Sequence, residues 1–120
     1  MDLDLLLIEA SRFGLTQAVV KLLDQGADVQ CVDNYALAIA SYYGHVNVVS
    51  VLLKAGADVN VRDDEALRYT SRNGHVDVVS LLLKAGANVH AVGDSALRWA
   101  AENGHVDVFN LLRQYSKETL

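Results

Sequence analysis

A six-residue string, NGHVDV, occurs at residues 73–78 and again at 103–108, and a near copy, YGHVNV, occupies residues 43–48. The copies are thirty residues apart, and single glycines keep the same spacing at positions 14, 44, 74 and 104. A fixed period of this length indicates a chain built from stacked copies of one supersecondary unit. Four units, at about residues 1–30, 31–60, 61–90 and 91–120, account for a single domain of 120 residues.

The pattern inside each unit predicts two short helices. In the third unit one face of the first helix carries small and apolar side chains, at Ala66, Leu67, Thr70 and Ser71. Their i, i+1, i+4, i+5 spacing is helical. We expect Asp63 or Asp64 to cap the start of this helix, and Gly74 to end it with a positive φ. A second apolar pattern at residues 76–83 predicts the second helix, and residues 87–94 the loop to the next unit.

Such short helices are marginal alone, so their apolar faces must be covered by neighbouring units. Because 52% of the residues are hydrophobic, each unit has a face to bury. Side-by-side stacking buries it in one continuous core, which predicts an all-α solenoid of four helix-turn-helix repeats. Polar changes at the two ends, such as Lys21 in the first unit and QYSKE in place of KAGAD in the last, suggest that these units act as caps.

The string GHVDVVSLLLKAGANV at residues 74–89, with parallel copies at 44–59 and 104–112, resembles the ankyrin repeat. The resemblance covers nearly the whole chain and implies an α-solenoid that binds other proteins. The usual ankyrin period is about 33 residues and its first helix starts with T-P-L-H. Here the period is thirty and that slot holds YALA, EALR and SALR, as in the shortened repeats of large DNA viruses of amoebae. Binding through projecting β-turn fingers is therefore not expected.

Three histidines, His45, His75 and His105, follow the turn glycines and raise the question of a metal site. Equivalent residues of adjacent stacked helices lie about 8–10 Å apart, whereas zinc–nitrogen bonds measure about 2.0–2.1 Å. We therefore expect no metal or other cofactor, and a structural role in which each histidine hydrogen-bonds the turn between helices. His90 is expected in a loop turn.

Other function classes are disfavoured by the composition. No nucleophile motif or phosphate loop is present, so we expect no enzyme, and Cys31 is interpreted as a small buried hydrophobe. A net charge of −5 without a Lys/Arg block disfavours nucleic acid. No apolar run reaches the roughly 20 residues of a membrane span. The lone cysteine and the acidic start predict a cytoplasmic protein, or one inside a host cell if it is viral.

Function is expected on the concave surface formed by the first helices, where corresponding positions differ most between units. The predicted partner-binding residues are Phe13, Tyr42, Tyr43, Arg68, Tyr69, Arg72, Arg98, Trp99 and Glu102. Tyr, Trp and Arg are enriched in interaction hot spots. Two plainer interpretations stay open: Tyr69 and Trp99 could pack between units, as could Ile39. Arg68 and Arg72 could pair with Glu65, Asp64 or Glu102 as a solvated face.

The sequence therefore predicts a non-enzymatic, monomeric protein-interaction module whose partner presents an acidic and apolar patch. One alternative is a dedicated inhibitor of an enzyme such as a kinase. Another is self-assembly through the apolar side chains of the first unit, at Leu3, Leu5, Ile8 and Phe13.

Overall fold

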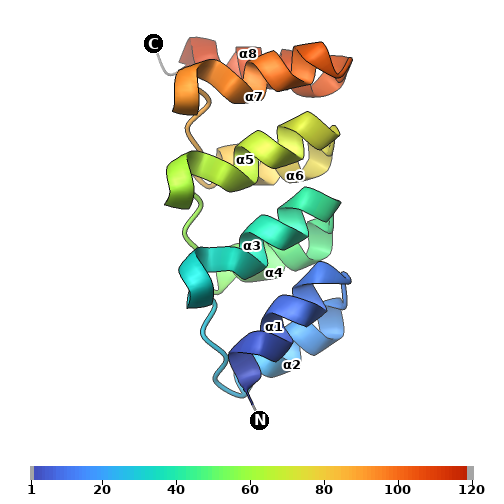
Figure 1. Ribbon diagram of the computed structural model, residues 1–120, viewed down its shortest axis with the longest axis vertical. Coiled ribbons are helices and arrows are strands. Elements are labelled where there is room, and N and C mark those ends of the chain that lie inside the picture. The colour runs from blue at the N-terminus through green and yellow to red at the C-terminus, as the bar shows by residue number, and fades with distance from the viewer. Residues whose placement is uncertain (1, 119–120) are drawn as a thin grey trace.

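The computed structural model describes residues 2–118, and within them the chain is all helical, with helix pairs stacked in one row (Figure 1). The helices are α1 (Leu3–Arg12), α2 (Thr16–Asp24), α3 (Cys31–Tyr43), α4 (Val46–Lys54), α5 (Val61–Asn73), α6 (Val76–Lys84), α7 (Ala91–Glu102) and α8 (Val106–Glu118). Each odd helix packs on the next odd helix and each even helix on the next even one. The predicted helix-turn-helix solenoid is confirmed.

The core consists of rows of residues thirty positions apart. Fully buried leucines and valines form these rows: Leu37 and Leu67; Leu52, Leu82 and Leu112; Val19, Val49 and Val79; Val48, Val78 and Val108. Burying one such side chain contributes about 1.5–3 kcal/mol. The predicted stripe of the third unit, from Ala66 to Ser71, is buried as expected. Each row crosses unit boundaries, so no unit has a core of its own.

The turns inside the units end at glycines in the left-handed conformation. Gly44 and Gly74 cap α3 and α5 with φ of 76° and 81°. Their amides bond carbonyls of the last helical turn, Ser41 O and Ser71 O. The prediction that Gly74 ends its helix with a positive φ is confirmed.

A ladder of side-chain bonds runs along the opposite, loop side, and each bond joins the start of a unit's first helix to the loop that ends the same unit. The N–H groups of Asp28, Asp58 and Asn88 donate to Oδ1 of Asp4, Asn34 and Asp64, at 2.8, 2.8 and 2.9 Å. The expectation that Asp63 or Asp64 caps a helix is wrong, because both residues lie in a turn of positive φ inside α5 and the helix has no side-chain cap bond. The Asp64 carboxylate instead accepts bonds from Asn60 and from the following loop.

Before each of the last three odd helices becomes regular, three consecutive residues adopt positive φ angles. These residues are 32–34, 62–64 and 92–94, with φ between 51° and 61°. A left-handed residue other than glycine costs about 1–2 kcal/mol, and Val32 and Val92 are β-branched. This turn was not predicted from the sequence, and it brings Asn34 and Asp64 within reach of the next loop.

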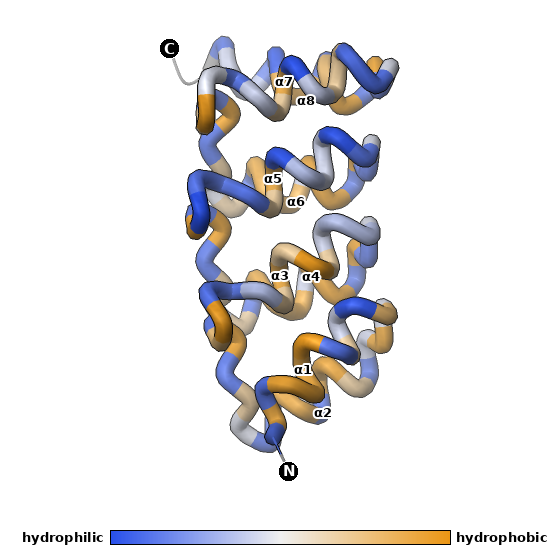
Figure 2. The backbone as a smooth tube through the Cα atoms, viewed as in Figure 1, coloured by the Kyte–Doolittle hydropathy of each residue, from blue (hydrophilic) through white to orange (hydrophobic). Residues whose placement is uncertain are grey.

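The stack measures 44 × 24 × 18 Å, with the odd helices in one layer and the even helices in the other. Figure 2 shows that α1 and α2 are largely hydrophobic, whereas the start of α5 is hydrophilic. No helix within residues 2–118 is long and apolar enough to cross a membrane.

Candidate functional site

The glycine-following histidines connect one unit to the turn of the unit before it. The Nε2–H of His45 donates to Arg12 O at 2.9 Å, and that of His75 donates to Tyr42 O at 3.0 Å. Each ring also lies flat against the preceding unit's glycine. A Cβ added to Gly14, Gly44 or Gly74 would meet the next unit's imidazole Nδ1 at 2.6, 2.5 and 2.5 Å. The predicted hydrogen bond to the turn is confirmed for His45 and His75, and it reaches the neighbouring unit's turn.

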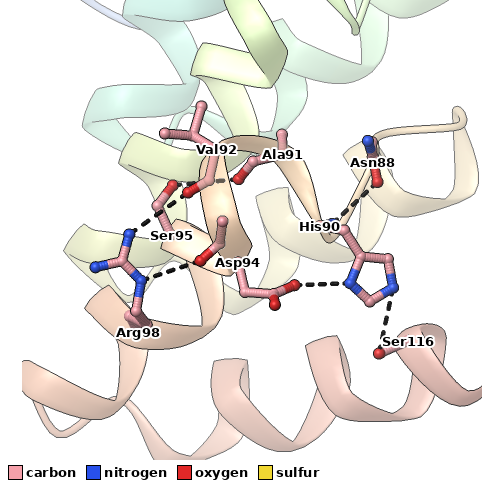
Figure 3. A network of polar contacts seen from close by, with 9 residues as sticks. Asn88, His90, Ala91, Val92, Asp94, Ser95, Arg98 and Ser116 are labelled. Atoms are coloured by element: carbon pink, nitrogen blue, oxygen red, sulfur yellow. Dashed lines mark hydrogen bonds and ion pairs between the residues drawn. The ribbon is translucent and has the colours of Figure 1, made fainter.

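His90 occupies the turn before α7, as predicted, and holds a small polar network (Figure 3). Its Nδ1–H donates to Asp94 Oδ1 at 2.7 Å, and its Nε2 accepts from Ser116 Oγ at 3.4 Å. In the described part of the chain, no group of three or more His, Cys, Asp and Glu side chains could hold a metal ion.

Cys31 is buried at the start of α3, with its Sγ 3.9 Å from Asp4 O. Burial raises the pKa of this thiol, and the nearby charge of Asp4 raises it further. The thiolate is the nucleophilic form, so the structure agrees with the interpretation of Cys31 as a packing residue.

The layer of odd helices carries an open hollow of about 370 Å³. It is lined by Arg12, Tyr35, Ala38, Ile39, Tyr42, Tyr43, Glu65 and Tyr69, which come from α1, α3 and α5. Tyr42 and Tyr43 are 41% and 49% exposed, so neither ring is committed to the core. Arg12 is bonded to the Glu9 carboxylate at 3.2 Å, a contact that raises the pKa of its guanidinium.

A row of ring contacts runs from this hollow towards the last unit. Ring centroids lie 5.1 Å apart for Tyr43 and Tyr42, 6.3 Å for Tyr42 and Tyr69, and 5.5 Å for Tyr69 and Trp99. Such separations suit aromatic pairing. Tyr69 and Trp99 are half-buried and Ile39 is buried, so the packing interpretation holds fully only for Ile39.

The predicted arginines lie beside this row but make no pair with the suggested carboxylates. Arg68 and Arg72 stack over Tyr69 and Trp99, at 5.7 and 5.5 Å from the ring centroids. Arg68 also donates to the carbonyls of residues 62 and 63, and Arg98 to those of residues 92 and 93. Both therefore bond the left-handed turns. Within residues 2–118, none of these arginines forms an ion pair.

Two predicted residues belong neither to the hollow nor to the row of rings and its neighbouring arginines. Phe13 is 64% exposed and lines a groove on the outer face of the first unit, together with Leu6 and Leu15. Glu102 is exposed near the C-terminal end of α7. Ile8, which we expected to help pair two copies, is buried and cannot do so.

Sequence reasoning missed Tyr35, Arg12 and Glu65 as lining residues. Tyr35 and Tyr42 are seven residues apart in α3, a spacing that places them on one helix face. The sequence therefore contained the signal for Tyr35. It contained no such signal for Arg12 and Glu65, because each of them reaches the hollow from a neighbouring unit.

Comparison with known proteins agrees with the architecture. A family model described as ankyrin repeats (3 copies) matches residues 4–63 and again residues 63–119. No curated protein matches the chain. The two matches together span nearly the whole sequence, and the helix pairs, glycine turns and stacked core described above are what the family requires. The chain belongs to the ankyrin repeat family.

Proposed function

We propose that this chain binds a partner protein through the exposed face of its odd helices, centred on the tyrosine-lined hollow. Ankyrin repeats are in general protein–protein interaction modules and typically not enzymes. The observation that carries the proposal is the continuous row of partly exposed rings from Tyr43 to Trp99, which crosses three units. Large, partly exposed aromatic side chains beside arginines are the residues that dominate interaction energies.

The size of this face suits a standard interface. Four units spaced by helix packing distances give a groove of roughly 30–40 Å. A groove of that length can bury the ~800 Å² per side of a typical specific complex.

The partner that fits has an apolar element for the hollow and acidic groups for the arginine side. Arg68, Arg72 and Arg98 contact neutral acceptors or rings and form no ion pair in the described chain, so their charges remain uncompensated. Acidic groups of a partner would find three such arginines along α5 and α7. In this proposal Tyr42, Tyr43 and Tyr69 hold the apolar element, Trp99 and Glu102 flank the arginines, and Phe13 extends the surface at its first unit.

The test is affinity capture with a double variant, Tyr42→Ala with Arg72→Ala. The matched control is Asn47→Ala with Lys84→Ala, which changes exposed residues of the even helices. Proteins captured by the unchanged chain and by the control should be lost with the double variant. Removing a hot-spot residue costs about 2 kcal/mol or more, so each of the two substitutions should weaken binding about thirtyfold or more. Equal capture by all three chains would remove the proposal.

A role as an enzyme inhibitor uses the same surface and differs only in its consequence. If the captured partner is an enzyme, its turnover with and without the chain separates inhibition from simple attachment.

A further inference from the structure

The repeats themselves show what covers the C-terminal side of a unit. Within the chain, Ser11, Ser41 and Ser71 are fully buried, as are Val19, Val49 and Val79. The same positions in the last unit, Ala101 and Phe109, are exposed and half-buried. The difference between them is the presence of a following unit. Each of these surfaces is therefore a docking face for the next repeat.

The last unit keeps this docking face in an apolar form. A small hollow of about 100 Å³ is lined by Ala100, Ala101, Gly104, His105, Val106 and Phe109. Gly14, Gly44 and Gly74 each hold the next unit's imidazole, whereas a Cβ at Gly104 would meet no atom within 4 Å. Two changes from the inner units, serine to alanine at position 101 and valine to phenylalanine at position 109, make the face more apolar.

The first unit presents a complementary face at the other end of the stack. Leu15 takes the place of the glycine-following histidine and is 53% exposed. Leu6, 37% exposed, stands where Ala36, Ala66 and Ala96 are buried in the other units. With Phe13 and Leu22 these leucines line an apolar groove of about 420 Å³.

We propose that a second copy of this chain docks head to tail, with Leu15 of one copy seated in the hollow at Gly104 of the other. The step from one copy to the next then repeats the step that the chain makes three times internally. In this contact the apolar side chain of Leu15 enters the hollow lined by Ala101, Gly104 and Phe109.

The first unit carries five acidic and two basic residues and the last unit four acidic and three basic, so both units are net negative. Basic side chains nevertheless lie beside the docking face of the last unit, where Arg113 stands 5.9 Å over the Phe109 ring. On the last helix, Arg113 stands where Leu23, Leu53 and Leu83 lie in the other units, and Lys117 follows one turn later. The contact is heterologous, because the two faces differ, so a third copy can add in the same way.

The test is sedimentation equilibrium of the pure chain, from about ten micromolar to about one millimolar, a range that covers weak contacts. The mass of the unchanged chain should rise above 13.0 kDa as the concentration increases. Leu15→Asp and Gly104→Asn should each remain at 13.0 kDa. Asn47→Asp adds the same charge away from both ends and should associate like the unchanged chain.

Neither variant threatens the fold. Leu15 is the N-cap of α2 and has no side-chain bond, so an aspartate there is favourable. Asparagine tolerates the positive φ of Gly104 better than other residues, and its side chain has open space within its own copy. Far-ultraviolet circular dichroism checks that both variants keep their helices.

An equimolar mixture of the two variants gives the decisive readout. Each variant keeps one intact face, so the mixture should form pairs of twice 13.0 kDa and nothing larger. A constant mass of 13.0 kDa for the unchanged chain would overturn the proposal and favour the monomer expected from the sequence. Association lost with Leu15→Asp but kept with Gly104→Asn would overturn it in favour of two first units meeting face to face. Partner capture through Tyr42 and Arg72 is unaffected by either result.

Discussion

The contact between a turn glycine and the next unit's histidine can be measured by replacing Gly44 with alanine. The new Cβ would lie 2.5 Å from Nδ1 of His75, so the imidazole must move. Gly104→Ala is the matched control. Its φ is 75° against 76° for Gly44, and its Cβ meets no atom within 4 Å.

The expected losses differ because only one substitution causes a collision. A left-handed alanine costs about 1–2 kcal/mol at either position. At Gly44 the overpacking adds about 1–3 kcal/mol. Displacing the ring also weakens the bond from His75 to Tyr42 O, worth about 1 kcal/mol. We expect Gly104→Ala to lower the free energy of unfolding by about 1–2 kcal/mol and Gly44→Ala by about 3–6 kcal/mol.

Urea unfolding followed by helical circular dichroism measures both values, at a concentration where sedimentation shows single copies. The double variant Gly44→Ala with His75→Ala provides a cycle, because removing the ring removes the collision. Its loss should fall short of the sum of the two single losses by about 1 kcal/mol or more. Equal losses for Gly44→Ala and Gly104→Ala would refute the view that each histidine stabilises the stack by packing on the turn glycine of the preceding unit.

Two further predictions concern the ladder and the thiol. Asn34→Ala removes the side-chain oxygen that accepts the Asp58 amide, and should lower the free energy of unfolding in urea by about 1–3 kcal/mol. The control is Asp33→Ala, because Asp33 lies in the same left-handed turn but has an exposed side chain, and its loss should be smaller. Equal losses for the two variants would contradict the proposed role of Asn34. Because burial raises the pKa of Cys31 in the folded state, its contribution to stability is fully present below the unfolded thiol's pKa of about 8.5 and is lost as the pH rises through the folded value. Cys31→Ala should therefore reduce the fall in unfolding free energy between about pH 8 and pH 10, and an unchanged slope would count against the burial effect.

The fold was predictable because its signals are local and repeated. The glycine series and the stripe from Ala66 to Ser71 depend only on helix geometry and on which residues tolerate a positive φ. The family match and the stacked helices confirm that prediction. The destination of the Asp64 carboxylate was not predictable, because capping its own helix and bonding the next loop require the same side chain.

The candidate surface was predicted in part. Tyr42, Tyr43, Tyr69 and Trp99 were identified by comparing positions across units, and the structure brings their rings together. The same comparison grouped Phe13 with Tyr43, whereas the structure places it on an end face. Equivalent positions in different repeats are not always covered by the same neighbours. In the structure, the first and last units contact another unit on one side only.

The sequence alone determined the unit, its two helices and the need to stack, because a thirty-residue period with one apolar face per helix has no other way to exclude water. The tertiary structure decided the left-handed turns and the bonds between units. Each non-glycine residue at positive φ is unfavourable by itself. Bonds made within each folded unit offset that cost: Asn34 and Asp64 reach the loop that ends their own unit, and Arg68 and Arg98 reach the carbonyls of the turn at the start of their own helix.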